Sequence, residues 1–301
     1  MSADPLNHSV KSRKLAKPTS EPHWLGNALH VLRGNPVTAA AAVGVLILIV
    51  LALIGQWIVP HDPYTTDAYH VLEAPSATHW FGTDQLGRDI FARVIVATRL
   101  DLLMSVSAVL LSAVAGVVLG ALTGYFGGIF DRIVSRVADV LMAFPLFVLA
   151  MGLVAALGNS VQNIVLATAI VNVPFYLRLM RAEVNVRRQA GYVEAARVGG
   201  HSHLSILLRQ IVPNCLSPIA IQGSLNLGWA VINAAGLSFI GLGVKAPTAE
   251  WGIMVSEGAQ QMLSGEWWTV AFPGLALVLA IFCFNLLGDG LRDLLDPQRR
   301  Q

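Results

Sequence analysis

Two histidines separated by a single residue, His201 and His203, are of a type that suits metal chemistry. Imidazole is a common transition-metal ligand, and two histidines can share one ion when both face it. On a helix, however, positions two apart point about 200° away from each other. We therefore predict that these histidines lie at a surface or an interface and hold no metal.

Catalytic motifs are absent from the sequence, which contains no G-x-S-x-G, no HExxH and no phosphate-binding Walker loop. The two cysteines, Cys215 and Cys283, lie in apolar stretches and are expected to be small buried hydrophobic residues. We expect no catalytic, cofactor or metal site in this chain, and no enzyme activity of its own.

One pair of charges lies at the start of a long apolar stretch, where charge is expensive. Arg136 and Asp139 are three residues apart, a spacing that allows an ion pair on one helix. Two interpretations stay open: a paired helix end that is purely structural, or a contact that moves as a gate.

The composition indicates that these residues belong to a membrane protein. The chain has 301 residues, of which 55% are hydrophobic and 13% charged, with a mean hydropathy of +0.62. A soluble domain carries about 25% charged residues, so much of this surface must face lipid. The net charge of +2 and the lack of a basic stripe give no indication of nucleic-acid binding.

Five apolar stretches are long enough to cross a hydrocarbon layer of about 30 Å. The stretch 140–177 suits two helices with a turn at 158–160, and the stretch 210–244 suits one helix followed by a short apolar excursion. The sequence therefore predicts an all-α integral membrane protein with six transmembrane helices. The five stretches are 37–60, 102–130, 140–177, 210–244 and 267–288.

The distribution of Lys and Arg predicts the orientation. With six spans, sixteen of the 20 Lys and Arg residues fall on the side of both termini, and four fall on the other. The positive-inside rule makes the first side cytoplasmic, so both termini are predicted inside. Residues 61–98 and 237–267 are then external, and 181–211 form the long internal loop. Ahead of the first span, apolar residues at helical spacing over 24–32 predict an interfacial amphipathic helix.

The internal loop predicts two short helices. Glu194 to Ala196 suit the first helix, which Gly199 and Gly200 would end, and Pro213 marks a bend into the next span. Such a pair of helices could be a docking element or a simple cap on the bundle. The second helix is predicted from one apolar face formed by Leu204, Leu207, Leu208 and Ile211.

This loop resembles the EAA-x3-G-x9-I-x-L-P motif of permease subunits of bacterial ABC importers. It departs from the motif at residues 210–212, where Gln-Ile-Val replaces I-x-L. The residues that carry the resemblance are Glu194, Ala195, Ala196, Gly200 and Pro213.

Other segments resemble the dipeptide, oligopeptide and nickel importers of the same family. Residues 81–89 are similar to their F-G-T-D-x-x-G-R-D signature, and segments 237–252 and 288–297 are similar as well. The resemblance covers about residues 30–297 and points to the second, C-type permease subunit. The signature residues are Gly82, Thr83, Asp84, Gly87, Arg88 and Asp89.

The resemblance implies a type I importer permease fold in the bacterial inner membrane, with a cytoplasmic coupling helix at Glu194. It implies a sister permease, two ATPase subunits that bind ATP and Mg²⁺, and an external solute-binding protein. This chain would form half of the pathway for di- or oligopeptides or similar solutes. Chelated nickel or glutathione as cargo, and a secondary ion-coupled carrier, are the alternatives. The signature in 81–89 would meet the sister permease or the binding protein, or would only hold its loop in place.

The predicted spans and the resemblance together divide the chain into four parts. Residues 1–36 form a cytoplasmic tail with the interfacial helix, and 37–98 form the first transmembrane helix with its periplasmic loop. Residues 99–297 form the permease core with five transmembrane helices and the EAA-type loop, and 298–301 form a second cytoplasmic tail.

Overall fold

The structure is a computed structural model that describes residues 35–295, with side chains described to residue 293. The predicted interfacial helix at 24–32 and the tail at 298–301 lie outside the described residues. Within the described part the backbone is helical, apart from loops and one isolated bridge between Thr83 and Asp89. The α-helices are α2 Pro36–Ile58, α3 Ile90–Phe126, α4 Gly128–Met142, α5 Leu146–Leu157, α6 Val161–Arg187, α7 Gly191–Val198, α8 His203–Ile206, α9 Leu216–Phe239, α10 Trp251–Ala259 and α11 Trp268–Leu295.

Five helical stretches of the described chain are long and apolar enough to cross a membrane: α2, α3, α6, His203–Phe239 and α11. A sixth span exists only if α4 and α5 are counted together, and these two helices meet at an angle of 96°. The turn predicted at 158–160 is present between α5 and α6, but the first of the two helices predicted over 140–177 is interrupted at 143–145. Pro145 lacks a backbone N–H and disfavours helical geometry at Phe144, so the helix breaks there.

The second span also begins earlier than predicted. Helix α3 starts at Ile90, where the side chain of Asp89 accepts a hydrogen bond from the amide of Ala92 at 2.7 Å. Hydropathy alone placed its start at residue 102, because charged residues interrupt the apolar pattern before that point. The part boundary drawn at residue 98 thus falls inside a helix.

Helices α3 and α6 pack closely along a row of glycines spaced four apart: Gly116, Gly120 and Gly124. A Cβ atom on Gly120 would lie 2.5 Å from the carbonyl oxygen of Leu177, which is far inside van der Waals contact. Small residues at this spacing let two backbones approach each other, as is common between membrane helices. This packing forms the centre of the bundle.

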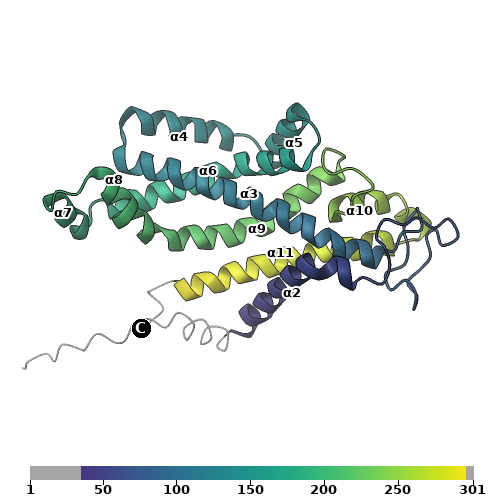
Figure 1. The fold of residues 1–301 in the computed structure, drawn as a ribbon. Helices are drawn as coiled ribbons and strands as arrows, with labels where there is room; N and C mark the ends of the chain where they lie inside the picture. The colour runs from purple at the N-terminus through teal and green to yellow at the C-terminus, as the bar shows by residue number, and fades with distance from the viewer. Residues whose placement is uncertain (1–34, 296–301) are drawn as a thin grey trace, which may run out of the picture.

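Different helices and loops lie at the two ends of the bundle (Figure 1). The start of α2, the end of α11 and the short helices α7 and α8 lie toward one end, at the left of the view. The loop 59–89 and helix α10 lie at the opposite end, at the right. We call these the α7 end and the α10 end. The first and last described helices thus have their outer ends at the α7 end, which agrees with an even number of crossings between them.

Candidate functional site

Helix α7 is attached to the bundle by one side and leaves the other free. Val193 is fully buried in a cluster that includes Met180 and Val184 of α6. Glu194 and Ala195 are exposed. The first helix predicted in the internal loop is therefore present, and its acidic residue faces away from the bundle.

The turn after α7 depends on glycine. Gly199 has φ −68°, whereas Gly200 has φ +79°, a left-handed conformation that residues with a Cβ adopt only at a cost. The amide of His201 then donates to the carbonyl of Ala196 at 3.1 Å, which ends the helix. The predicted role of Gly200 as the turn residue is confirmed in the backbone geometry.

The second predicted helix is present but is not a regular α-helix. One α-helical turn, α8, continues as a π-helical turn over Leu207–Ile211 and a 3₁₀ turn over Val212–Cys215, which contains Pro213. A π-turn has more residues per turn than an α-helix and shifts the side chains around the axis. The single apolar face predicted here is therefore wrong: Leu207 and Ile211 are buried, whereas Leu204 and Leu208 are more than half exposed.

Two polar contacts fix this loop to the end of α3. The hydroxyl of Tyr125 lies 2.9 Å from Nδ1 of His203, and Arg188 donates to the carbonyl of Gly124 at 3.1 Å. His201 lies before α8 rather than on it, so the argument from helical spacing does not apply to this pair. The two histidines are exposed, as predicted.

Arg136 and Asp139 do not pair with each other. Asp139 instead accepts a hydrogen bond from Arg178 of α6 at 2.6 Å, and Arg136 is exposed on α4. A second ion pair, bidentate at 2.6 and 2.7 Å, joins Asp131 to Arg181. The predicted local pair is therefore wrong, because α4 lies beside α6 and the nearest cations belong to the neighbouring helix.

At the α10 end, the charged signature residues are buried. Arg88 is 1% exposed; its Nε donates to Asp84 at 2.6 Å and its Nη2 to Glu257 of α10 at 3.1 Å. Arg93 is equally buried and donates to the carbonyls of Pro63 and Pro247. This network ties the loop 59–89 to α10, so its charges serve the loop's own structure.

The other signature residues shape the same loop. The Thr83 side chain donates to the carbonyl of His70 and accepts from the amide of Glu73, while Gly82 and Gly87 have positive φ. Asp89 caps α3 and is 3% exposed. Of the two interpretations left open by the sequence, the geometry favours residues that hold the loop in place.

Two buried acids that the sequence reasoning missed connect α3 to α10. The carboxyl groups of Asp101 and Glu250 are hydrogen-bonded to each other, and Asp101 also accepts from the amide of Trp251 at 3.2 Å. Glu250 caps α10 and is fully buried, and this burial raises the pKa of its carboxyl group. A bond between two carboxyl groups requires that one of them carries a proton. In the sequence, Asp101 directly precedes the uncharged run that starts at residue 102, so it looks like the end of a loop. It can be recognised as a buried acid only once α3 is known to begin at Ile90.

Comparisons with known proteins assign this architecture. The family "Binding-protein-dependent transport system inner membrane component" matches residues 116–301. The family "N-terminal TM domain of oligopeptide transport permease C" matches residues 24–75.

Individual relatives match over most of their length. The chain is 44% identical over 268 residues to a probable D,D-dipeptide transport system permease protein of Escherichia coli (strain K12), covering 89% of this chain and 90% of the relative. It is 45% identical over 267 residues to a glutathione transport system permease protein of Escherichia coli O6:K15:H31 (strain 536 / UPEC), covering 88% of each. The chain therefore belongs to the family of inner-membrane components of binding-protein-dependent transport systems, as a multi-pass permease subunit of an ABC importer of the dipeptide and oligopeptide group.

Proposed function

We propose that this chain forms half of the translocation pathway for short peptides, with D,D-dipeptides and glutathione as the first candidates. The observation that carries the proposal is the 44–45% identity, over nearly nine-tenths of the chain, to permeases named for those two cargoes. The other half would come from a sister permease, and a solute-binding protein would deliver the cargo. ATP and Mg²⁺ would be bound by the partner ATPases, with no cofactor in this chain.

Helix α7 is the proposed contact to an ATPase subunit. Its buried Val193 holds it against the bundle, while Glu194 and Ala195 remain exposed for a partner. Val198, 87% exposed at the end of the same helix, adds an apolar group that a protein contact would cover. The turn at Gly200 sets the angle at which this surface is presented. These features support the resemblance of the loop to the EAA motif.

The α7 end would lie in the cytoplasm and the α10 end outside. Support comes from the positive-inside count, with sixteen of 20 Lys and Arg residues on the side of the termini. The middle of α2, where Val43, Leu46 and Leu53 are each more than half exposed, would face lipid or the sister permease. On the outside, the buried network of Asp84, Arg88 and Glu257 would keep a fixed surface for the binding protein.

The test is uptake by the reconstituted system of both permeases, the ATPases and the binding protein. Proteoliposomes containing ATP should accumulate a labelled D,D-dipeptide or glutathione, and should do so only with the matching binding protein. Unlabelled dipeptide, oligopeptide, glutathione and chelated nickel added in turn rank the cargoes by competition. Uptake of a non-peptide solute with no competition by any peptide would overturn the proposed substrate class.

A further inference from the structure

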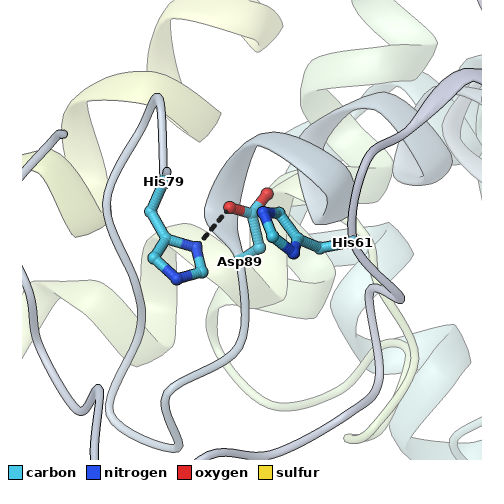
Figure 2. Close-up of side chains that lie close together, drawn as sticks. All are labelled: His61, His79 and Asp89. Carbon is cyan, nitrogen blue, oxygen red and sulfur yellow. Dashed lines mark hydrogen bonds and ion pairs between the residues drawn. The ribbon is translucent and has the colours of Figure 1, made fainter. Parts of the chain in front are cut away.

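Three side chains of metal-ligand type meet at the α10 end: His61, His79 and Asp89 (Figure 2). Each offers one ligand atom, and these atoms all lie within 4.8 Å of one another. The residues come from separate places in the sequence. His61 follows the end of α2, His79 lies within the loop 59–89, and Asp89 directly precedes α3.

Hydrogen bonds hold these side chains in place. Nδ1 of His79 lies 2.8 Å from Oδ2 of Asp89, whose side chain is 2% exposed and also caps α3. Nε2 of His61 lies 3.0 Å from the carbonyl oxygen of Thr78. Since a carbonyl oxygen can only accept, Nε2 of His61 is the donor, and Nδ1 is the ring nitrogen left to face an ion. A backbone carbonyl that fixes the imidazole tautomer is a common outer contact of metal-binding histidines.

The two imidazole rings lie close together, with centroids 4.8 Å apart, and both are partly exposed. A third histidine, His70, has its ring centroid 6.0 Å from that of His79, but its Nδ1 is paired with Asp67 at 2.7 Å. His70 is not part of the group whose ligand atoms lie within 4.8 Å of one another, so it is a neighbour of the cluster and not one of its members. His61 and His79 are therefore the histidines that remain for an ion beside Asp89.

We propose that His61, His79 and Asp89 form a binding site for a transition-metal dication of the Zn²⁺ type. Two imidazole nitrogens and one carboxylate oxygen suit zinc, nickel or copper, whereas Mg²⁺ and Ca²⁺ prefer oxygen alone. Ligands lie about 2.0–2.2 Å from zinc, so small side-chain rotations would bring the three atoms into range. The bound ion would displace the proton shared by His79 and Asp89. Three protein ligands leave a fourth position for water or for a ligand from a partner.

Such an ion would join the end of α2 to the start of α3 and so restrain the loop between them. The expectation of no metal site rested on sequence motifs and on the pair His201 and His203, neither of which involves these three residues. Metal binding here would be independent of the cargo, since the three residues lie in and beside the loop 59–89.

The experiment is a Co²⁺ titration of the full chain in nanodiscs, purified without a histidine tag. Tetrahedral Co²⁺ absorbs visible light, and Zn²⁺ should remove the signal by competition. The wild type should bind one equivalent at this site. His61→Gln should weaken that binding at least about tenfold, because loss of even an outer contact costs that much. His70→Gln is the matched control in the same loop and should bind as the wild type does.

His61→Gln leaves Asp89, the cap of α3, in place. Thermal unfolding without metal should therefore match that of the wild type, and such a match shows that the variant is folded. Metal held elsewhere in the chain would contribute equally to all three proteins. Equal titrations of wild type and His61→Gln, or no saturable binding by the wild type, would overturn the proposal. An equal loss in His70→Gln would overturn the assigned ligand set.

Discussion

The carboxylate of Asp139 on α4 lies 2.6 Å from Nη2 of Arg178 on α6. This ion pair and the pair Asp131–Arg181 connect α4, the first helix of the bent α4–α5 pair, to the bundle. Both partners of the Asp139 pair are about half exposed, at 49% and 51%. Such a pair contributes less than about 1 kcal/mol. Asp139→Asn should therefore leave folding and assembly nearly unchanged.

Asp131→Asn should loosen α4 more than Asp139→Asn does. The side chain of Asp131 is only 17% exposed, and its bond to Arg181 is bidentate. Hydrogen exchange of the α4 amides, measured in nanodiscs, compares the two variants directly. Equal protection of α4 in wild type and in both variants would show that packing alone holds this helix.

Gly120→Ala tests the close contact of α3 with α6. A Cβ at this position overlaps the backbone of Leu177 and the side chain of Met180, so the helices must separate at a cost of about 1–3 kcal/mol. The matched control is Gly152→Ala, where a Cβ meets nothing within 4 Å. Thermal unfolding should show a loss for Gly120→Ala and an unchanged or slightly raised midpoint for Gly152→Ala. Equal midpoints would mean that the helices do not approach as described.

The buried acids predict a contrast between two substitutions at one position. Asp101→Asn keeps an acceptor for the amide of Trp251 and a donor for the carboxylate of Glu250, so the stability should change little. Asp101→Ala leaves both partners buried and unpaired, which costs about 1–3 kcal/mol or more. Thermal unfolding measures both. If Asn were as damaging as Ala, the account of one shared proton would be wrong.

The sequence predicted the helical class, the five long apolar spans and the turn at Gly200, because apolar length and glycine chemistry are local properties. The sixth predicted crossing corresponds to α4 and α5, which make one span only if the bent pair is counted together. It placed the start of α3 wrongly, since buried charges such as Arg93 and Asp101 resemble loop residues when their partners are unknown. The partner of Asp139 was mistaken for the same reason. Arg178 is 39 positions away in the sequence and becomes a neighbour only when α4 lies beside α6.

Of the candidate functional residues, too, some could be predicted from the sequence and others could not. The exposed face of α7 follows from a short pattern of small residues around Glu194. The cluster of His61, His79 and Asp89 does not, because its members are brought together by the path of the loop 59–89 rather than by any spacing. The π-helical turn after α8, whose Leu207 and Ile211 are buried in the bundle, likewise has no simple signature in the sequence.

The orientation can be checked with topology reporters. Fusions after residue 301 and within 183–210 should behave as cytoplasmic, because the positive charges lie on that side. Fusions near residues 75 and 255 should behave as external. A cytoplasmic signal at residue 75 would contradict the assignment of the loop 59–89 to the outer side.

The central claim is that α7 couples this subunit to an ATPase, and two substitutions test it. Gly200→Val places a β-branched residue at φ +79°, a strain of about 1–3 kcal/mol that would change the presentation of α7. Glu194→Lys reverses a charge on the exposed face. Gly191→Ala, which adds a methyl group in open space on the same helix, is the control. Gly200→Asn should be milder than Val, since Asn tolerates the left-handed region.

The most direct measurement is ATP-driven peptide uptake together with the ATPase rate in vesicles that contain the complete importer. Recovery of the sister permease by pulldown shows that each variant assembles. The account predicts that Gly200→Val and Glu194→Lys still assemble but lose uptake by about fivefold or more, as expected for at least 1 kcal/mol. ATP hydrolysis should then be lost or no longer depend on the binding protein. Normal coupled uptake in both variants would show that α7 is only a cap on the bundle.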